Sequence, residues 1–244
     1  MKEFVLVFLA LVIGMNCHAQ FNDTTNYFIN YASTGTINKT NDGSSYVLNN
    51  ALRFTLYKKN FSINTFNSWI YGKQQHQLAN NDFSSTLDFD LFKTDRHIYY
   101  WGLVNYEKSY SLKIDHRLQT GLGIGYYVID RKNFVFQISD GILYEKNDLE
   151  NAEGLANTGY ETYRNSLRLK FRIIYVDILT LENIDFLQHS LTDRKDYIIK
   201  STTTLSVKLV KWLSVTVALN YNKLNVTHRE NLLLNYGITV SRYF

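Results

Sequence analysis

Basic side chains recur at alternate positions of the segment 163–175, which contains Arg164, Arg168, Lys170 and Arg172. In an extended strand every second side chain points to the same face, so we expect these four cations to share one face. Three basic residues of other segments fall on the corresponding face of their own strands: Arg53, Lys200 and Lys208. Three acidic residues do the same: Asp88, Asp90 and Glu182.

Two kinds of chemistry are open to this set of charges. A basic track that lines a water-filled passage would attract anionic solutes and set a preference for negative charge. Alternatively, the cations and carboxylates form an ion-pair network that fills the interior, because buried charges persist only when they are paired. We favour the ion-pair network and keep the basic track as the alternative.

Catalytic and metal-binding patterns are weak. The pairs Asp115-His116 and His189-Ser190 resemble fragments of a nucleophilic relay, but no third member is evident from the sequence. No two histidines have the spacing of a metal motif. The run GLGIGYY over 121–127 lacks the following helix that a phosphate-binding loop requires. We therefore expect no catalytic residues, no metal and no cofactor, and interpret the glycines as space for large side chains of neighbouring strands.

The elements that position these residues are strands. The chain has 244 residues, no proline and 15 % aromatic residues, a composition typical of long uninterrupted strands. Apolar residues alternate with polar ones almost everywhere beyond residue 26, as in Leu232, Leu234, Tyr236, Ile238 and Val240. Asp140 departs from the pattern, since it falls on the apolar side of 134–144, and we attribute this to a bulge or a local phase error.

Twelve such segments can be delimited, and this number together with their length predicts a membrane barrel. The segments are 26–38, 45–57, 61–72, 82–93, 97–108, 115–129, 133–145, 161–174, 178–189, 197–209, 213–224 and 230–244. A tilted strand crosses a bilayer with about 9–11 residues, and each of these segments is long enough to do so. Short connections follow the even segments, and longer polar ones such as 73–81 and 145–160 follow the odd segments.

This layout is that of an all-β, twelve-stranded antiparallel transmembrane β-barrel with short periplasmic turns and longer extracellular loops. Its apolar face would contact lipid and its polar face would line the lumen. A soluble β-sandwich also alternates, but its strands are usually shorter. Aromatic residues near the predicted strand ends would form girdles at the membrane interfaces, and we expect some of them to fill the lumen instead: Tyr27, Phe61, Trp69, Tyr71, Tyr99, Trp101, Tyr144, Tyr163, Trp212, Tyr221 and Tyr243.

Residues 1–19 have the features of a signal peptide. Lys2 precedes an apolar stretch over 4–13, and small residues lead to a predicted cut between Ala19 and Gln20. A lipid anchor on Cys17 is disfavoured because Asn16 precedes it, where a small residue is needed. Residues 20–244 would then be the barrel, located in the outer membrane of a Gram-negative bacterium. The terminal Phe244 resembles the signal read by the barrel-assembly machinery, although Arg242 departs from it.

Two stretches of the chain resemble a known family. The first is Ala32-Ser33-Thr34-Gly35-Thr36-Ile37-Asn38, with Thr36-Ile37 where the family more often has Asn-Thr. The second pairs Tyr106-Glu107 at the end of one strand with Gly121, Gly123, Gly125 and Tyr126 in the next. In these residues the chain resembles the YdiY-like group of salt-induced outer-membrane proteins. The resemblance implies an integral outer-membrane barrel, an association with salt stress and no established catalytic residues.

The sequence therefore predicts a monomeric outer-membrane barrel, either a narrow pore for small anionic solutes or a purely structural barrel. Its expected partners are outer-membrane lipids and lipopolysaccharide, the barrel-assembly machinery during insertion, and small solutes. Nucleic acid is not expected, because the net charge of +4 comes without a basic run. Two alternatives remain: an outer-membrane enzyme that modifies lipids or glycans, and a secreted β-sandwich that binds carbohydrate.

Overall fold

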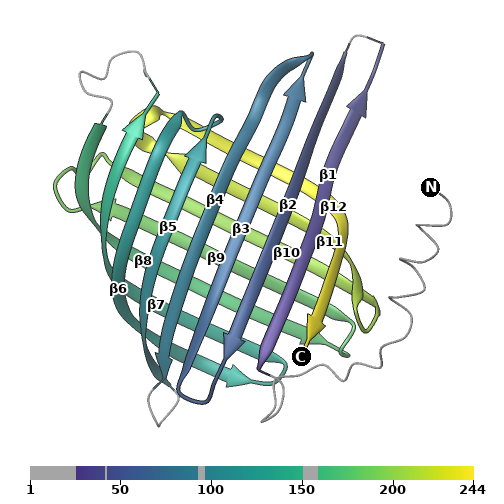
Figure 1. Cartoon of the computed structure of the whole chain (residues 1–244), viewed down its shortest axis with the longest axis vertical. Coiled ribbons are helices and arrows are strands. Elements are labelled where there is room, and N and C mark those ends of the chain that lie inside the picture. Colours follow the sequence, from purple (N-terminus) through teal and green to yellow (C-terminus); the bar gives the residue numbers. More distant parts are fainter. Residues whose placement is uncertain (1–25, 42, 93–96, 151–158) are drawn as a thin grey trace.

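The chain forms a closed antiparallel barrel, shown in Figure 1. The computed structural model describes residues 26–41, 43–92, 97–150 and 159–244, and within them twelve strands pair in chain order until β1 meets β12. The strands are β1 (Tyr27–Lys39), β2 (Ser44–Tyr57), β3 (Phe61–Gln74), β4 (Gln77–Phe92), β5 (Ile98–Ser109), β6 (Ile114–Arg131), β7 (Phe134–Leu149), β8 (Gly159–Tyr175), β9 (Leu179–Ser190), β10 (Tyr197–Val210), β11 (Leu213–Leu224) and β12 (Arg229–Tyr243). The predicted twelve-stranded barrel is thus confirmed. The predicted signal peptide and its cut at Ala19-Gln20 lie outside the described residues.

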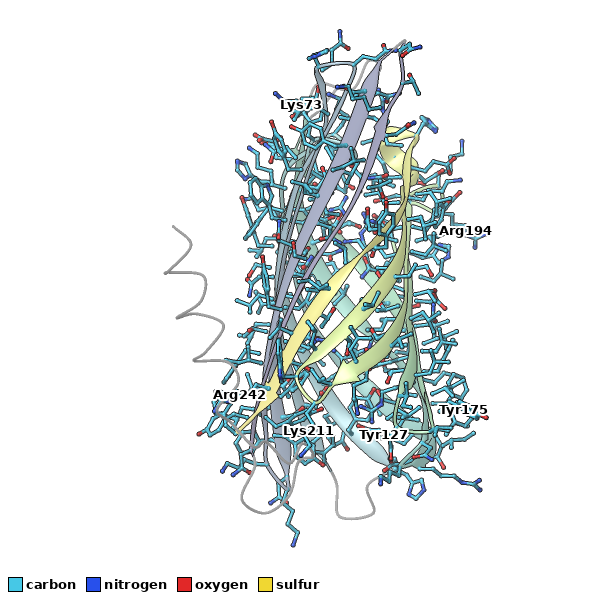
Figure 2. The ribbon with its side chains drawn as sticks, turned by 90° about the vertical axis from the view of Figure 1, so that its right-hand side faces the viewer. Lys73, Tyr127, Tyr175, Arg194, Lys211 and Arg242 are labelled. Atoms are coloured by element: carbon cyan, nitrogen blue, oxygen red, sulfur yellow. The ribbon has the colours of Figure 1, made fainter. Side chains whose placement is uncertain are left out.

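The strand that opens the barrel and the strand that closes it meet at one end, where the amide nitrogen of Tyr27 donates to the carbonyl oxygen of Phe244 over 2.9 Å. We call this the periplasmic end, as predicted for the short turns, and the opposite one the extracellular end. Figure 2 shows Lys211, Tyr127 and Tyr175 toward the periplasmic end and Lys73 toward the extracellular end. In the part of the chain that the structure describes, no helix has the length and apolar character needed to cross a bilayer.

Several strands continue beyond their predicted ends. The predicted loop 73–81 is mostly strand, because β3 and β4 are joined at Gln75 and His76, whose φ angles are 49° and 67°. Two successive residues with positive φ form the tight hairpin turn whose twist matches that of the strands. Similarly, β7 runs to Leu149, so Glu145 lies in a strand and not in the predicted loop 145–160.

The two faces of the sheet differ as the alternation predicts. Outward apolar side chains are well exposed, for example Leu122 at 72 % and Leu232 at 63 %, whereas most of the inward positions between such residues are polar or glycine. Because the sheet closes on itself, its apolar face is turned outward and is not packed against a second sheet. This arrangement excludes the sandwich alternative and satisfies the backbone hydrogen bonds that a bilayer cannot.

The glycine row of β6 makes room for large rings inside the barrel, as the sequence analysis proposes. A Cβ atom on Gly123 would overlap the ring of Trp101 and the carbonyl oxygen of Asp140. A Cβ atom on Gly125 would overlap the ring of Tyr99. Tyr99 and Trp101 are 2 % and 6 % exposed, so these two predicted girdle residues instead fill the lumen.

We expect Gly123→Ala to destabilise the barrel by about 1–3 kcal/mol, because the added methyl group meets backbone on one side and an indole ring on the other. Gly102→Ala is the matched control, since its Cβ atom would have no neighbour nearer than 3.9 Å. Urea unfolding of the refolded protein, followed by its heat-modifiable gel migration, compares the two variants. Equal stability of Gly123→Ala and Gly102→Ala would show that the barrel tolerates a methyl group between the backbone of β7 and the ring of Trp101.

Candidate functional site

The lumen contains three layers of side chains, which follow one another from the extracellular end toward the periplasmic end. The register of β8 determines their order, because Arg164, Arg168, Lys170 and Arg172 point inward and descend along this strand. The cross-strand partner of Arg172 in β9 is Glu182, so that carboxylate also points inward.

The outermost layer is an apolar plug. It consists of five buried side chains packed together: Leu112, Ile114, Leu149, Ile198 and Leu224. They come from β6, β7, β10, β11 and the β5–β6 connection, so the plug joins opposite walls of the barrel. Each is between 0 and 4 % exposed, which makes this layer a dry seal at the extracellular end.

Below the plug lies an upper ion cluster of three cations and three carboxylates: Arg117, Arg164, Lys200, Glu107, Glu145 and Asp196. Glu145 accepts two hydrogen bonds from Arg164, at 2.9 Å from Nε and 2.7 Å from Nη2. Both side chains are fully buried, as is that of Arg117. The cluster is formally neutral, which is the condition under which charges tolerate such burial.

Asp196 is the one member of the cluster that lies outside the strands, in the β9–β10 connection. Its Oδ2 accepts a hydrogen bond of 2.7 Å from Nη2 of Arg164. Burial raises the pKa of the Asp196 carboxyl above its usual value, and the neighbouring Arg164 charge opposes this shift. Arg164 therefore holds this carboxyl toward its charged form in a place that would otherwise favour the neutral acid.

Two contacts of the middle of the barrel cross the lumen. Lys200 on β10 donates to Oε2 of Glu107 on β5 over 2.7 Å. Gln119 on β6 donates to Gln188 on β9 over 3.0 Å. The first bond joins strands five places apart in the barrel and the second joins strands three places apart, so both run through the lumen and not along the sheet. Together with the plug they place packed and bonded side chains across the extracellular half of the lumen.

The innermost layer, the lower charged lumen, holds seven further inward charges: Arg53, Arg168, Lys170, Arg172, Asp88, Asp90 and Glu182. Arg168 Nη1 lies 3.9 Å from Asp88 Oδ2, and its guanidinium lies over the rings of Trp101 and Phe186 at 5.6 and 6.0 Å. Asp90 accepts a hydrogen bond of 3.1 Å from Ser62.

Water reaches the lower charged lumen more easily than the upper ion cluster. The side chains of Arg168 and Asp88 are 15 % and 27 % exposed, against 0 % for Arg164 and Glu145. Phe66, an inward residue of β3 beneath the guanidinium of Arg53, is 37 % exposed. Four cations face three carboxylates in this layer, so its formal charge is positive.

The predicted basic set is thus divided between places with different surroundings. Arg164 and Lys200 belong to the neutral upper ion cluster and are not part of an exposed track. Arg53, Arg168, Lys170 and Arg172 lie in the lower charged lumen. Lys208 is an exposed residue at the periplasmic end of β10. Of the three predicted acidic partners, Asp88 has an ion-pair contact with a predicted cation, Arg168.

The sequence analysis missed four of the six residues of the upper ion cluster: Glu107, Arg117, Glu145 and Asp196. Arg117 shares the inward phase of Gln119 and Gly121, so the alternation in β6 could have revealed it. Glu145 was assigned to a loop. Asp196 lies in a connection, where no periodicity indicates that the backbone folds back into the lumen.

The fragments that resemble a nucleophilic relay do not assemble into one. His189 is exposed on the outer face of β9, whereas Ser190 is buried inside with Thr162 at 2.7 Å. His116 lies 3.6 Å from Asp115, and its Nδ1 is 2.7 Å from the hydroxyl of Tyr106. Across the described residues, no group of three or more side chains suited to a metal ion is present.

Comparisons with known proteins agree with this architecture. A family model described as "Protein of unknown function, DUF481" matches residues 32–231. The NanC porin has a TM-score of 0.52 and 10 % identity, with 88 % of this chain and 99 % of that chain covered. The translocator domain of the autotransporter NalP from Neisseria meningitidis has a TM-score of 0.49 and 11 % identity, over 98 % and 95 % of the two chains. An outer-membrane channel of Pseudomonas putida F1 has a TM-score of 0.49 and 9 % identity, with 93 % of this chain and 100 % of that chain covered. No curated protein matches the chain.

Proposed function

The chain belongs to the DUF481 family of proteins of unknown function and is an outer-membrane β-barrel, and on that premise we propose that it is a gated channel for small anions. The observation that carries the proposal is the contrast between the buried, neutral upper ion cluster beneath the apolar plug and the wetter, positive lower charged lumen. A barrel with only a structural role has no need of an uncompensated charge in its interior.

The preference for anions follows from the lower charged lumen. Its cations exceed its carboxylates, and the one ion pair between them is the 3.9 Å contact of Arg168 with Asp88, among the residues that the structure describes. In a narrow passage with low-dielectric walls, even one uncompensated charge raises the local concentration of counter-ions. A small anion that enters from the periplasmic end would meet Arg172 and Lys170 before Arg168.

The gate is the upper ion cluster together with the apolar plug. Passage requires the cross-lumen bond between Lys200 and Glu107 to break and the plug to separate. Both are small sets of contacts between walls that are otherwise held by their own strand ladders. The barrel could therefore open its lumen without losing its hydrogen-bonded sheet.

Reversal potentials in planar bilayers test the anion preference. In a salt gradient we expect the purified protein to show openings that prefer anions, and Arg168→Glu to abolish or invert this preference, because it changes the balance of the lower charged lumen by two charges. Arg172→Glu, which leaves the ring contacts of Arg168 in place, should shift the reversal potential in the same direction.

Arg242→Glu is the matched control, since this residue is exposed on the outer face of β12 at the periplasmic end (Figure 2). It makes the same change of charge outside the lumen and should leave the selectivity near that of the unchanged protein. An equal shift in Arg242→Glu and in both lumenal variants would mean that surface charge, and not the lumen, determines the preference.

A purely structural barrel is the second candidate, and the dry apolar plug is the observation that favours it. A purely structural barrel would show no channel openings in planar bilayers at any voltage. An enzymatic role is not part of the proposal, because the structural likeness is to porins and channels and the histidine pairs do not form a relay. The association with salt stress that the resemblance implies has no counterpart in the contacts described here.

A further inference from the structure

The lipid-facing surface carries a polar stripe that the channel proposal does not use. Apolar residues occupy most outward positions of the barrel, but the middle of four consecutive strands, β7 to β10, is polar. The stripe consists of Asp140, Asn165, Asn183, Asp185, Ser201 and Thr203.

Asp140 truly points outward. The pairing of β7 with both of its neighbours has no register shift at this residue, so neither a bulge nor a phase error turns it inward, contrary to the expectation from the sequence. It is exposed between the outward side chains of Ile138 and Ile142, which are 40 % and 55 % exposed. Its two oxygens accept hydrogen bonds of 2.9 and 3.1 Å from the amide of Asn165.

A second carboxylate lies on the other side of the stripe. Asp185 accepts a hydrogen bond of 3.2 Å from Asn183, and the same amide also donates to Thr203 at 3.0 Å. Asn183 is only 7 % exposed, yet its Oδ1 has no hydrogen-bond partner. Lipid tails offer no donors, so the acceptors on this face are incompletely satisfied in a lone barrel.

The two halves of the stripe lie at similar depth. Asp140 is the sixth residue after Phe134, where β7 begins at the periplasmic end, and Asp185 is the sixth after Leu179, where β9 begins there. A two-fold axis along the membrane normal rotates a barrel without changing depth. Such an axis near β8 and β9 would place one half of the stripe, Asp140 and Asn165, opposite the other half in the second barrel. That other half is formed by Asn183, Asp185 and Thr203, and the symmetry repeats the contact with the two barrels exchanged.

We propose that the polar stripe is the interface of a homodimer, in which a second copy of this chain covers the same four strands. The two faces are complementary, because the hydroxyls of Ser201 and Thr203 can donate to the carboxylates and to Oδ1 of Asn183 in the other copy. Hydrogen bonds between polar side chains contribute to association inside a membrane. This inference is independent of whether the lumen conducts, and it departs from the monomer expected from the sequence.

The test is a disulfide between two copies. Leu187 lies on the outer face of β9, opposite Leu167 of β8 and close to the proposed axis, and is 37 % exposed. Cys17, the one cysteine of the chain, belongs to the predicted signal peptide, so Leu187→Cys introduces the sole thiol of the processed protein. We expect oxidation in isolated outer membranes to convert Leu187→Cys largely into a dimer of this chain.

Leu122→Cys is the matched control, because Leu122 is more exposed but lies on β6, outside the stripe. It should give little dimer. Adding Asp140→Leu and Asp185→Leu to Leu187→Cys should lower the dimer yield by about fivefold or more, as the loss of a few interfacial hydrogen bonds predicts, while heat-modifiable migration verifies that the barrel still folds.

Three results would overturn the proposal. One is equal cross-linking of Leu187→Cys and Leu122→Cys, which indicates random collision. Another is a dimer yield that does not respond to the aspartate substitutions. The third is cross-linking only in mixtures of Leu187→Cys with Asn67→Cys on β3, which would indicate head-to-tail rows that use the opposite side of the barrel.

Discussion

Glu145→Leu is expected to lower the free energy of unfolding by about 3–5 kcal/mol, because it removes one partner of a buried ion pair and leaves the other charged. Glu145 is the central acceptor of the upper ion cluster. It takes two hydrogen bonds from Arg164 and a third, of 2.6 Å, from Gln119, and it lies 3.8 Å from Nε of Arg117. Without Glu145, the cluster keeps three cations, two of which are buried guanidinium groups. Only the carboxylates of Glu107 and Asp196 remain to balance them.

The measurement is urea unfolding of the protein refolded into lipid vesicles. Asp115→Leu is the control, since the Lys108–Asp115 pair is equally short at 2.7 Å but both of its side chains are more than 40 % exposed. Exposed pairs contribute little to stability, so this variant should unfold close to the unchanged protein. If Glu145→Leu and Asp115→Leu are equally stable, the upper ion cluster is not the buried network described here.

Ile198→Ser combined with Lys200→Ala is expected to raise the open probability of the channel by about tenfold or more, a change that corresponds to the loss of one apolar contact set and one charged hydrogen bond. Ile198 is 1 % exposed in the apolar plug, and Lys200 makes the cross-lumen bond to Glu107. Both residues lie on the inward face of β10, so one short segment controls both closed layers.

The matched control is Ile199→Ser combined with Leu205→Ala, which changes outward positions of the same strand that lie outside the polar stripe. Single-channel recording of both double variants separates the two faces. We expect frequent openings when the inward pair is changed and unaltered behaviour when the outward pair is changed. Long silence of the inward variant, in protein that is folded by gel migration, would favour the purely structural barrel.

The strands could be predicted from the sequence because a closed barrel imposes a strict alternation on its residues. Lipid selects an apolar side chain at every second position, and a slip of one residue would reverse the whole strand. Most segments were therefore placed within a few residues of their ends. The errors lie where alternation continues past the membrane, as in β4, which begins at Gln77 and not near residue 82.

The lumen could be predicted only in part. Alternation indicates that Arg164 and Arg168 share a face, but it does not reveal which strand supplies the group opposite each of them. The bond between Lys200 and Glu107 joins residues 93 positions apart, across a diameter that depends on the stagger of all twelve strands. For the same reason, the sequence analysis, which favours an ion-pair network, does not identify Glu145 as the buried partner of Arg164.

Asp140 illustrates the opposite case. Alternation placed it correctly on the lipid side, and the expectation that a carboxylate must avoid lipid led to the wrong conclusion that the strand is irregular there. The carboxylate is retained on that face by its contact with Asn165. A residue that contradicts a pattern this strict is better interpreted as a sign of a partner than as an error of phase.

The resting conductance of the purified, unchanged protein in a planar bilayer tests the central claim most directly, namely that the lumen is closed by its own side chains yet can open. We predict a closed baseline after insertion, interrupted by brief openings that prefer anions. A steady open level from the moment of insertion would contradict the closed extracellular half, and openings that prefer cations would contradict the positive lower charged lumen.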